Sequence, residues 1–183
     1  MADYKVLLKA KNIACIGTSK PNHDEQNACI VIGYALTEME KIIVSGNAEG
    51  CDFAYATGAN VKHPSSVRLY LPNKSHHPEH WVLGNIIISI HEPEWKTIAR
   101  DNHPKYDGQS EYVKKLFDRN AGIILNSDYV IALPNTKKSW GGGTGHGMKI
   151  AKQLGKPVLN ISDEQTLSDL LKYLRSEVGE NSE

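Results

Sequence analysis

Two glycine-rich turns constrain this chain more than any other feature of its sequence. The first turn, residues 45–52, follows the apolar run 42–44, and the second, residues 141–147, follows the apolar run 129–133 and Trp140. A segment with helical spacing comes after each turn. Glycine lets the backbone approach a ligand closely, and a helix that begins there offers unpaired N–H groups and a partial positive charge. The pair of turns therefore predicts a crevice that binds a phosphorylated ligand.

Apolar runs and helical segments alternate along the chain. We expect strands near residues 13–16, 41–45, 67–72, 129–133 and 158–161. We expect helices near residues 24–40, 49–61, 92–100, 110–125, 145–154 and 163–178. This alternation predicts an α/β fold, a Rossmann-like doubly wound parallel sheet of about five strands with helices on both faces. Ligands of such sheets bind beyond the carboxyl ends of the strands, where the turns at Gly17, Gly46 and Gly143 would converge.

The length of 183 residues favours a single domain over 1–183. Residues 73–108 interrupt the alternation, and we interpret them as a long surface excursion that includes a short strand or helix near the run 86–88. The tail 179–183 is expected to be frayed. The N-terminus lacks a charged leader with a long apolar stretch, and the longest apolar run is too short to span a bilayer. We therefore expect a cytoplasmic protein without a membrane partner.

The charge balance bears on the class of partner. The sequence has 21 Lys plus Arg residues against 21 Asp plus Glu residues. A dedicated nucleic-acid binder usually carries a basic excess, because neutralisation of phosphates supplies most of its affinity. The sequence thus predicts a nucleotide-type small molecule as partner, with nucleic acid as an alternative that the neutral charge disfavours.

Several motifs, in order, resemble the SLOG superfamily. Residues 44–52 read VSGNAEGCD and look like the SGGAxGxD turn of that superfamily. Residues 128–132, followed by 142–145 and 155–158, are similar to its second half, and His103-Pro104 with the FDRN sequence of 117–120 resembles a phage and bacterial subgroup described as DNA-processing-A-like. The superfamily spans the DNA-processing protein A family, the LOG phosphoribohydrolases and nucleotide-sensing domains. The resemblance covers residues 11–162 and implies the fold, while it leaves the activity open.

The chain departs from the enzymes of this superfamily at one place. LOG enzymes and nucleoside deoxyribosyltransferases carry a glutamate three residues after a Gly-Thr pair, where it attacks the anomeric carbon or helps water to do so. Gly147 occupies that place here. An oxocarbenium-like centre needs a nearby carboxylate, which Glu49, Asp52 or Asp128 would have to supply.

Three functions stay open. We favour a protein that binds or senses a nucleotide. The alternatives are a hydrolase or transferase acting on the N-glycosidic bond of nucleotides, with Glu49 or Asp52 as the catalytic candidates, and a single-stranded DNA-binding protein of the recombination-mediator kind.

The predicted ligand-binding residues lie in the turns after the strands and on the helix near 110–125. Arg119 would neutralise a phosphate with its planar guanidinium, and Trp140 would stack on a base. Asp52 would accept hydrogen bonds from ribose hydroxyls, and His146 would act as a donor or proton carrier. The full set is Gly17, Thr18, Ser19, Ser45, Gly46, Gly50, Asp52, Arg119, Asn120, Trp140, Gly142, Gly143, Thr144, Gly145 and His146.

His76, His77 and His80 form the densest histidine cluster of the sequence. His76 and His80 have a spacing that could bind zinc on a helix. Pro78 lies between them, however, and no cysteine or acidic pattern completes a site. We expect a solvated loop here, no metal and no cofactor. Because this fold class commonly pairs through helices beside the site, we also expect a homo-oligomer.

Overall fold

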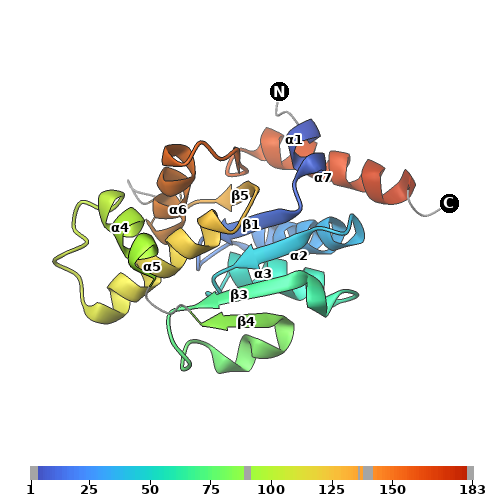
Figure 1. The fold of residues 1–183 in the computed structure, drawn as a ribbon. Coiled ribbons are helices and arrows are strands. Elements are labelled where there is room, and N and C mark those ends of the chain that lie inside the picture. Colours follow the sequence, from blue (N-terminus) through green and yellow to red (C-terminus); the bar gives the residue numbers. More distant parts are fainter. Residues whose placement is uncertain (1–3, 89–91, 136, 138–141, 181–183) are drawn as a thin grey trace.

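The computed structural model describes residues 4–88, 92–135, 137 and 142–180, which form a parallel sheet with helices on both sides (Figure 1). Six described strands lie in the order β4-β3-β2-β1-β5-β6. The strands are β1 (Asn12–Gly17), β2 (Ile42–Ser45), β3 (Val67–Leu71), β4 (Asn85–Ile88), β5 (Tyr129–Leu133) and β6 (Val158–Asn160). The predicted Rossmann-like fold is confirmed: the five expected strands are all present, and β4 adds one more at the edge.

The helices divide between the two faces of the sheet. One hydrophobic core joins the strands to α1 (Tyr4–Lys9), α2 (His23–Glu38), α3 (Cys51–Asn60) and α7 (Glu164–Glu180). The other joins them to α4 (Pro93–Asp101), α5 (Glu111–Leu125) and α6 (Gly142–Gln153). Two short 3-10 helices, η1 (Pro64–Ser66) and η2 (Pro78–Leu83), flank β3 and β4. Both faces of the sheet are therefore covered, as a parallel sheet requires.

The central strand β1 marks the switch in strand order. On one side Ile13 pairs with Ile43 of β2, and on the other side Gly17 pairs with Leu133 of β5. All five residues of β5 are buried, which explains why this strand is a continuous apolar run. The chain leaves β1 toward β2 and returns much later as β5, so the carboxyl end of β1 is the place where a ligand site is expected.

The starts of the helices next to this edge are fixed by their local sequence. Ser110 caps α5, because its side chain accepts a hydrogen bond from the backbone N–H of Val113 at 3.4 Å. Gly50 precedes α3 with a φ of 81°, and a Cβ there would lie 2.5 Å from the carbonyl oxygen of Thr18. Only glycine combines this left-handed conformation with so close an approach.

Two predicted helix boundaries differ from the structure, and one helix was not predicted. Helix α6 begins at Gly142 rather than near residue 145, so that the second glycine turn is itself the first turn of the helix. Helix α7 continues through Gly179 to Glu180, into the tail that was expected to be frayed. Helix α1 was not expected, because six residues are too few to show a helical period. Its Tyr4 ring stacks on Tyr173 of α7 at 4.5 Å, which ties the two chain ends together.

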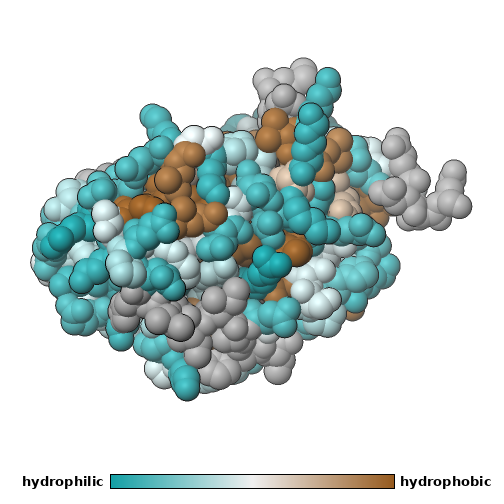
Figure 2. All heavy atoms as spheres, in the orientation of Figure 1, coloured by the Kyte–Doolittle hydropathy of each residue, from teal (hydrophilic) through white to brown (hydrophobic). Residues whose placement is uncertain are grey.

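The surface is mixed in character. Figure 2 shows hydrophobic residues as separate patches between hydrophilic ones, one patch lying beside the N-terminal end. Val6 and Leu8 of α1 are 41% and 40% exposed. Within the described part of the chain, no helix combines the length and the apolar character needed to cross a membrane. The homo-oligomer stays a prediction.

Candidate functional site

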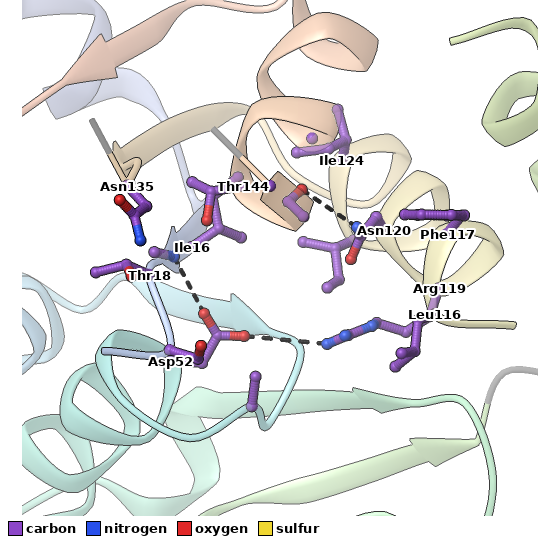
Figure 3. A pocket seen from close by; sticks show the side chains of 17 residues that line it. Ile16, Thr18, Asp52, Leu116, Phe117, Arg119, Asn120, Ile124, Asn135 and Thr144 are labelled. Atoms are coloured by element: carbon purple, nitrogen blue, oxygen red, sulfur yellow. Dashed lines mark hydrogen bonds and ion pairs between the residues drawn. The ribbon is translucent and has the colours of Figure 1, made fainter. Parts of the chain in front are cut away.

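A pocket of about 260 Å³ opens at the carboxyl edge of the sheet, beside the end of β1 (Figure 3). Its walls come from the end of β1, the first glycine turn, one side of α5 and the first turns of α6. The described lining residues are Ile16, Gly17, Thr18, Ser19, Ala48, Asp52, Leu116, Phe117, Arg119, Asn120, Ile123, Ile124, Asn135, Gly142, Gly143, Thr144 and Gly147. The two glycine turns thus converge on one pocket, as the sequence predicted.

Asp52 joins the end of β1 to the first glycine turn. Its Oδ1 accepts a hydrogen bond from the backbone N–H of Gly17, and its Oδ2 accepts one from the N–H of Gly46, both at 3.2 Å. The residue is 5% exposed. Burial raises the pKa of this carboxyl, while the Arg119 guanidinium and the backbone amides oppose the shift. Asp52 therefore holds the pocket wall together.

Arg119 brings a buried positive charge to the pocket from α5. It is 6% exposed, and its Nη1 lies 4.0 Å from Oδ2 of Asp52 (Figure 3). That distance makes an ion pair but exceeds a hydrogen bond. Within the described residues, Nε has no hydrogen-bond partner. Burial lowers the pKa of Arg119, although a guanidinium stays charged in proteins. The positive charge of Arg119 is thus only partly neutralised by Asp52.

The second glycine turn lies across the pocket from the first. Gly142 has a φ of 62°, and Gly142, Gly143 and Thr144 begin α6 and line the pocket. The first N–H groups of a helix have no partner within the helix and attract anions. The side chain of Asn120 donates from Nδ2 to the carbonyl oxygen of Gly143 at 3.3 Å and so links α5 to this turn. An anion in the pocket would meet this helix end as well as Arg119.

One wall of the pocket is apolar, and sequence reasoning missed its role. The apolar spacing of α5 indicates only packing for Leu116, Phe117 and Ile123, yet all three line the pocket, and Leu116 and Ile123 lie on the same side of the helix as Arg119. Ile16 and Ile124 extend this wall. The signal was present in the helical period, because residues three or four positions from Arg119 share its face. Asn135 and Ala48 also line the pocket, but they lie outside α5, and no pattern in the sequence indicates this role.

Several predicted residues do not line the pocket. Ser45 is fully buried, and its hydroxyl donates to the carbonyl oxygen of Cys15 at 3.0 Å. Gly46, Gly50 and Gly145 are not among the lining residues. Gly46 lies against the guanidinium of Arg119, Gly50 lies against the backbone of Thr18, and Gly145 lies in α6. Trp140 lies outside the described residues.

His146 is also turned away from the pocket. It is 3% exposed, its Nε2 lies 3.1 Å from the carbonyl oxygen of Ala99, and its ring meets the ring of Phe117 edge to face. Burial lowers the pKa of His146 to about 4. This residue is neutral at pH 7 and belongs to the packing between α4, α5 and α6.

The carboxylates that could stand in for the catalytic glutamate of the LOG enzymes are spread over the molecule. Glu49 is exposed and does not line the pocket. Asp128 precedes β5 and accepts hydrogen bonds from the backbone N–H groups of Lys11 and Asn12, at the opposite edge of the sheet. Gly147 does line the pocket, but a Cβ there would lie 2.8 Å from Cδ1 of Ile16. A side chain at position 147 would thus meet the apolar end of Ile16.

Comparison with known proteins points to the same fold. No protein-family model matches the chain, and no curated protein matches it in sequence. DNA processing protein A from Helicobacter pylori, a protein with a unique single-stranded DNA binding mode, superposes with a TM-score of 0.59 over 97% of this chain and 83% of that one, at 19% identity. The chain has the fold of DNA processing protein A.

A second solved structure agrees. DNA processing protein A from Streptococcus pneumoniae gives a TM-score of 0.59 at 20% identity, over 93% of this chain and 58% of that one. The predicted likeness to the fold of DNA processing protein A is therefore confirmed over nearly the whole chain. At these identities the likeness is one of fold.

Proposed function

We propose that the chain binds single-stranded nucleic acid and holds one of its phosphate groups in the pocket. The observation that carries this proposal is the buried guanidinium of Arg119, whose Nε lacks a hydrogen-bond partner among the described residues and whose ion pair with Asp52 spans 4.0 Å. A buried cation without hydrogen bonds is costly. A phosphate supplies the acceptor oxygens that an arginine binds best, and the start of α6 would add N–H donors.

The fold supports nucleic acid as the source of that phosphate, because the Helicobacter pylori protein with this fold binds single-stranded DNA. The neutral net charge does not oppose a local contact of this kind. It limits the number of phosphates that the protein can neutralise, and so it limits the affinity and its dependence on salt. We therefore rank single-stranded nucleic acid above the free nucleotide that the charge balance alone favoured.

A free nucleotide-type small molecule is the second candidate, and the shape of the pocket favours it. The cavity has an apolar wall that includes Ile16, Phe117 and Ile123, and its polar lining residues include Thr18, Asp52 and Arg119. Small-molecule sites combine such walls with a few polar groups. Cleavage of an N-glycosidic bond has less support. Asp52 is the only carboxylate among the described lining residues, and its oxygens already accept from Gly17 and Gly46.

The test is fluorescence anisotropy of a labelled oligothymidylate with wild type and two arginine variants. Arg119→Gln removes the buried charge, and Arg175→Gln removes an exposed one from α7 as the matched control. We expect Arg119→Gln to weaken binding at least about tenfold, as for a lost hydrogen bond to a charged group, and Arg175→Gln to leave it unchanged. Thr144→Val probes the pocket without disturbing the Asp52 ion pair, and it should weaken binding as well.

Competition with thymidine monophosphate separates the two candidates. If the mononucleotide binds as tightly as the oligonucleotide at equal phosphate concentration, the free nucleotide replaces nucleic acid as the ligand. Equal oligonucleotide affinity in wild type, Arg119→Gln and Thr144→Val, with folding verified by circular dichroism, would remove the pocket from the binding site altogether.

A further inference from the structure

A second group of chemically active side chains lies away from the pocket, in the segment between β3 and β4. The donor atoms of His77, Glu79 and His80 all lie within 4.8 Å of one another. Nδ1 of His77 is 3.1 Å from Oε1 of Glu79, and Nε2 of His80 is 3.9 Å from the same oxygen. The sequence suggested His76 with His80 as the metal-type pair, but the structure brings His77 to this position.

These distances match those between the ligands of a metal ion. Nitrogen and oxygen donors about 2.0–2.1 Å from a tetrahedral zinc ion lie about 3.4 Å from each other. The separations of 3.1 and 3.9 Å bracket this value. The two imidazole rings are stacked, with their centroids 5.2 Å apart and their planes 12° from parallel. The lone pairs of the ring nitrogens lie in the ring planes, so the rings must rotate out of this stack to bind one cation together.

The segment is held in place from two sides. The side chain of Asn47, in the first glycine turn, donates from Nδ2 to the carbonyl oxygens of His76 and His77 at 3.4 and 3.3 Å. The ring of His80 packs against Phe53 of α3, with the centroids 4.1 Å apart. The backbone of this segment and the ring of His80 are thus held before a metal arrives, which lowers the ordering cost of binding.

The charges around the cluster also suit a cation. The carboxylate of Glu79 lies beside both imidazole rings and supplies negative charge next to the place where a cation would bind. His76 faces elsewhere, since its Nδ1 lies 3.1 Å from the hydroxyl of Tyr112 on α5. The cluster accordingly offers two imidazoles and one carboxylate and leaves a coordination position for water.

We propose that His77, Glu79 and His80 bind a divalent transition-metal ion of the zinc type. Two imidazoles with one carboxylate are a donor set that such ions prefer over magnesium or calcium, which take oxygen ligands. The bound ion links three side chains of the segment between β3 and β4, while Asn47 and Phe53 hold that segment against the first glycine turn and α3. This proposal does not depend on what the pocket binds.

The experiment is calorimetric titration of the full, chelator-treated chain with zinc chloride, together with the visible absorption spectrum of the chain with cobalt. We expect one zinc ion per chain, a four-coordinate cobalt spectrum and a rise in melting temperature of about 5 °C or more at saturating zinc. Glu79→Gln keeps the shape of an exposed side chain and should weaken zinc binding at least about tenfold. His80→Gln should do the same.

His63→Gln is the matched control. Nε2 of His63 lies 3.5 Å from Oε1 of Glu38, which makes a histidine–carboxylate pair outside the cluster. Zinc affinity should be unchanged in this variant. The proposal is overturned if wild type binds no zinc, or if Glu79→Gln and His80→Gln bind it as tightly as His63→Gln does.

Discussion

The guanidinium of Arg119 lies directly against the backbone of Gly46, so that a Cβ on that glycine would be 1.4 Å from Nη1. The end of a flexible side chain can give way to such an intrusion, whereas the buried turn cannot. Gly46→Ala should therefore displace the guanidinium from its place beside Asp52 and leave the fold intact.

The first prediction is that Gly46→Ala weakens oligonucleotide binding at least about tenfold, because the displaced guanidinium no longer reaches a phosphate. Anisotropy titration measures the loss, and urea unfolding checks the fold. Gly108→Ala is the control, since a Cβ there would meet only the carbonyl oxygen of Lys105, at 3.9 Å. Unchanged affinity in Gly46→Ala would mean that Arg119 does not touch the ligand.

The second prediction concerns the start of α6. Gly143 is exposed, and a Cβ there would meet only Nδ2 of Asn120, at 3.8 Å. Gly143→Asp should fold, because an acidic residue in the first turn of a helix is favourable, yet it should repel a phosphate. Gly143→Ala adds the same Cβ without charge. We expect anisotropy to show binding lost in the aspartate variant and largely kept in the alanine variant; equal losses would indicate a steric effect instead.

The third prediction follows from the balance of 21 basic and 21 acidic residues. A site that neutralises one or two phosphates of a single strand gives a slope of log affinity against log salt between about −0.7 and −1.4. Titrations at several sodium chloride concentrations measure this slope. A slope steeper than about −3 would require a much larger basic surface than the proposed pocket.

The fourth prediction uses the burial of His146, whose pKa is lowered from 6.5 to about 4. Below pH 6.5 the unfolded chain takes up a proton that the folded chain does not, so the free energy of unfolding falls as the pH drops from about 6.5 to about 4. At pH 5 this residue alone should cost about 2 kcal/mol. Urea unfolding at pH 7 and pH 5 should show a smaller difference for His146→Gln than for wild type. An identical pH dependence in both proteins would contradict the buried neutral state.

The fifth prediction is that wild type releases no free base from nucleoside monophosphates above the uncatalysed background. Gly147 offers no carboxylate, and Asp52 is engaged by two backbone amides. Chromatography of a nucleotide panel after long incubation is the measurement. Should base appear, the same assay on Asp52→Asn and Glu49→Gln shows whether either carboxylate supports turnover, since losing a well-placed catalytic group costs about 10²-fold or more.

The sequence predicted most strands because buried parallel strands are continuous apolar runs, as in residues 129–133. β4 (Asn85–Ile88) was left open between strand and helix, because a short apolar run carries no period that separates the two. Whether this run forms a strand depends on its pairing with β3, which the local sequence does not encode. The start of α6 was misplaced because glycine has a poor helix propensity, although Gly142 and Gly143 form its first turn.

The same limits apply to the site. Arg119 and the glycine turns could be located because their motifs are local and resemble a known superfamily. The directions in which Ser45 and His146 point depend on packing. The hydroxyl of Ser45 donates to the carbonyl oxygen of Cys15, and the ring of His146 lies against the carbonyl oxygen of Ala99 in α4. Phe117 and Asn135 reach the pocket only through the assembled fold.

The position of β1 between β2 and β5 has a consequence for how the chain folds during synthesis. Ile13 pairs with both Ile43 and Tyr129, and the second partner leaves the ribosome long after the first. Until then one edge of the central strand has no partner, which exposes an apolar strand to aggregation and makes this topology slow to form. A growing chain that has already built β1, β2 and β3 still lacks Arg119 and the start of α6. Binding activity should therefore appear late, once β5 has been inserted and α6 has formed behind it.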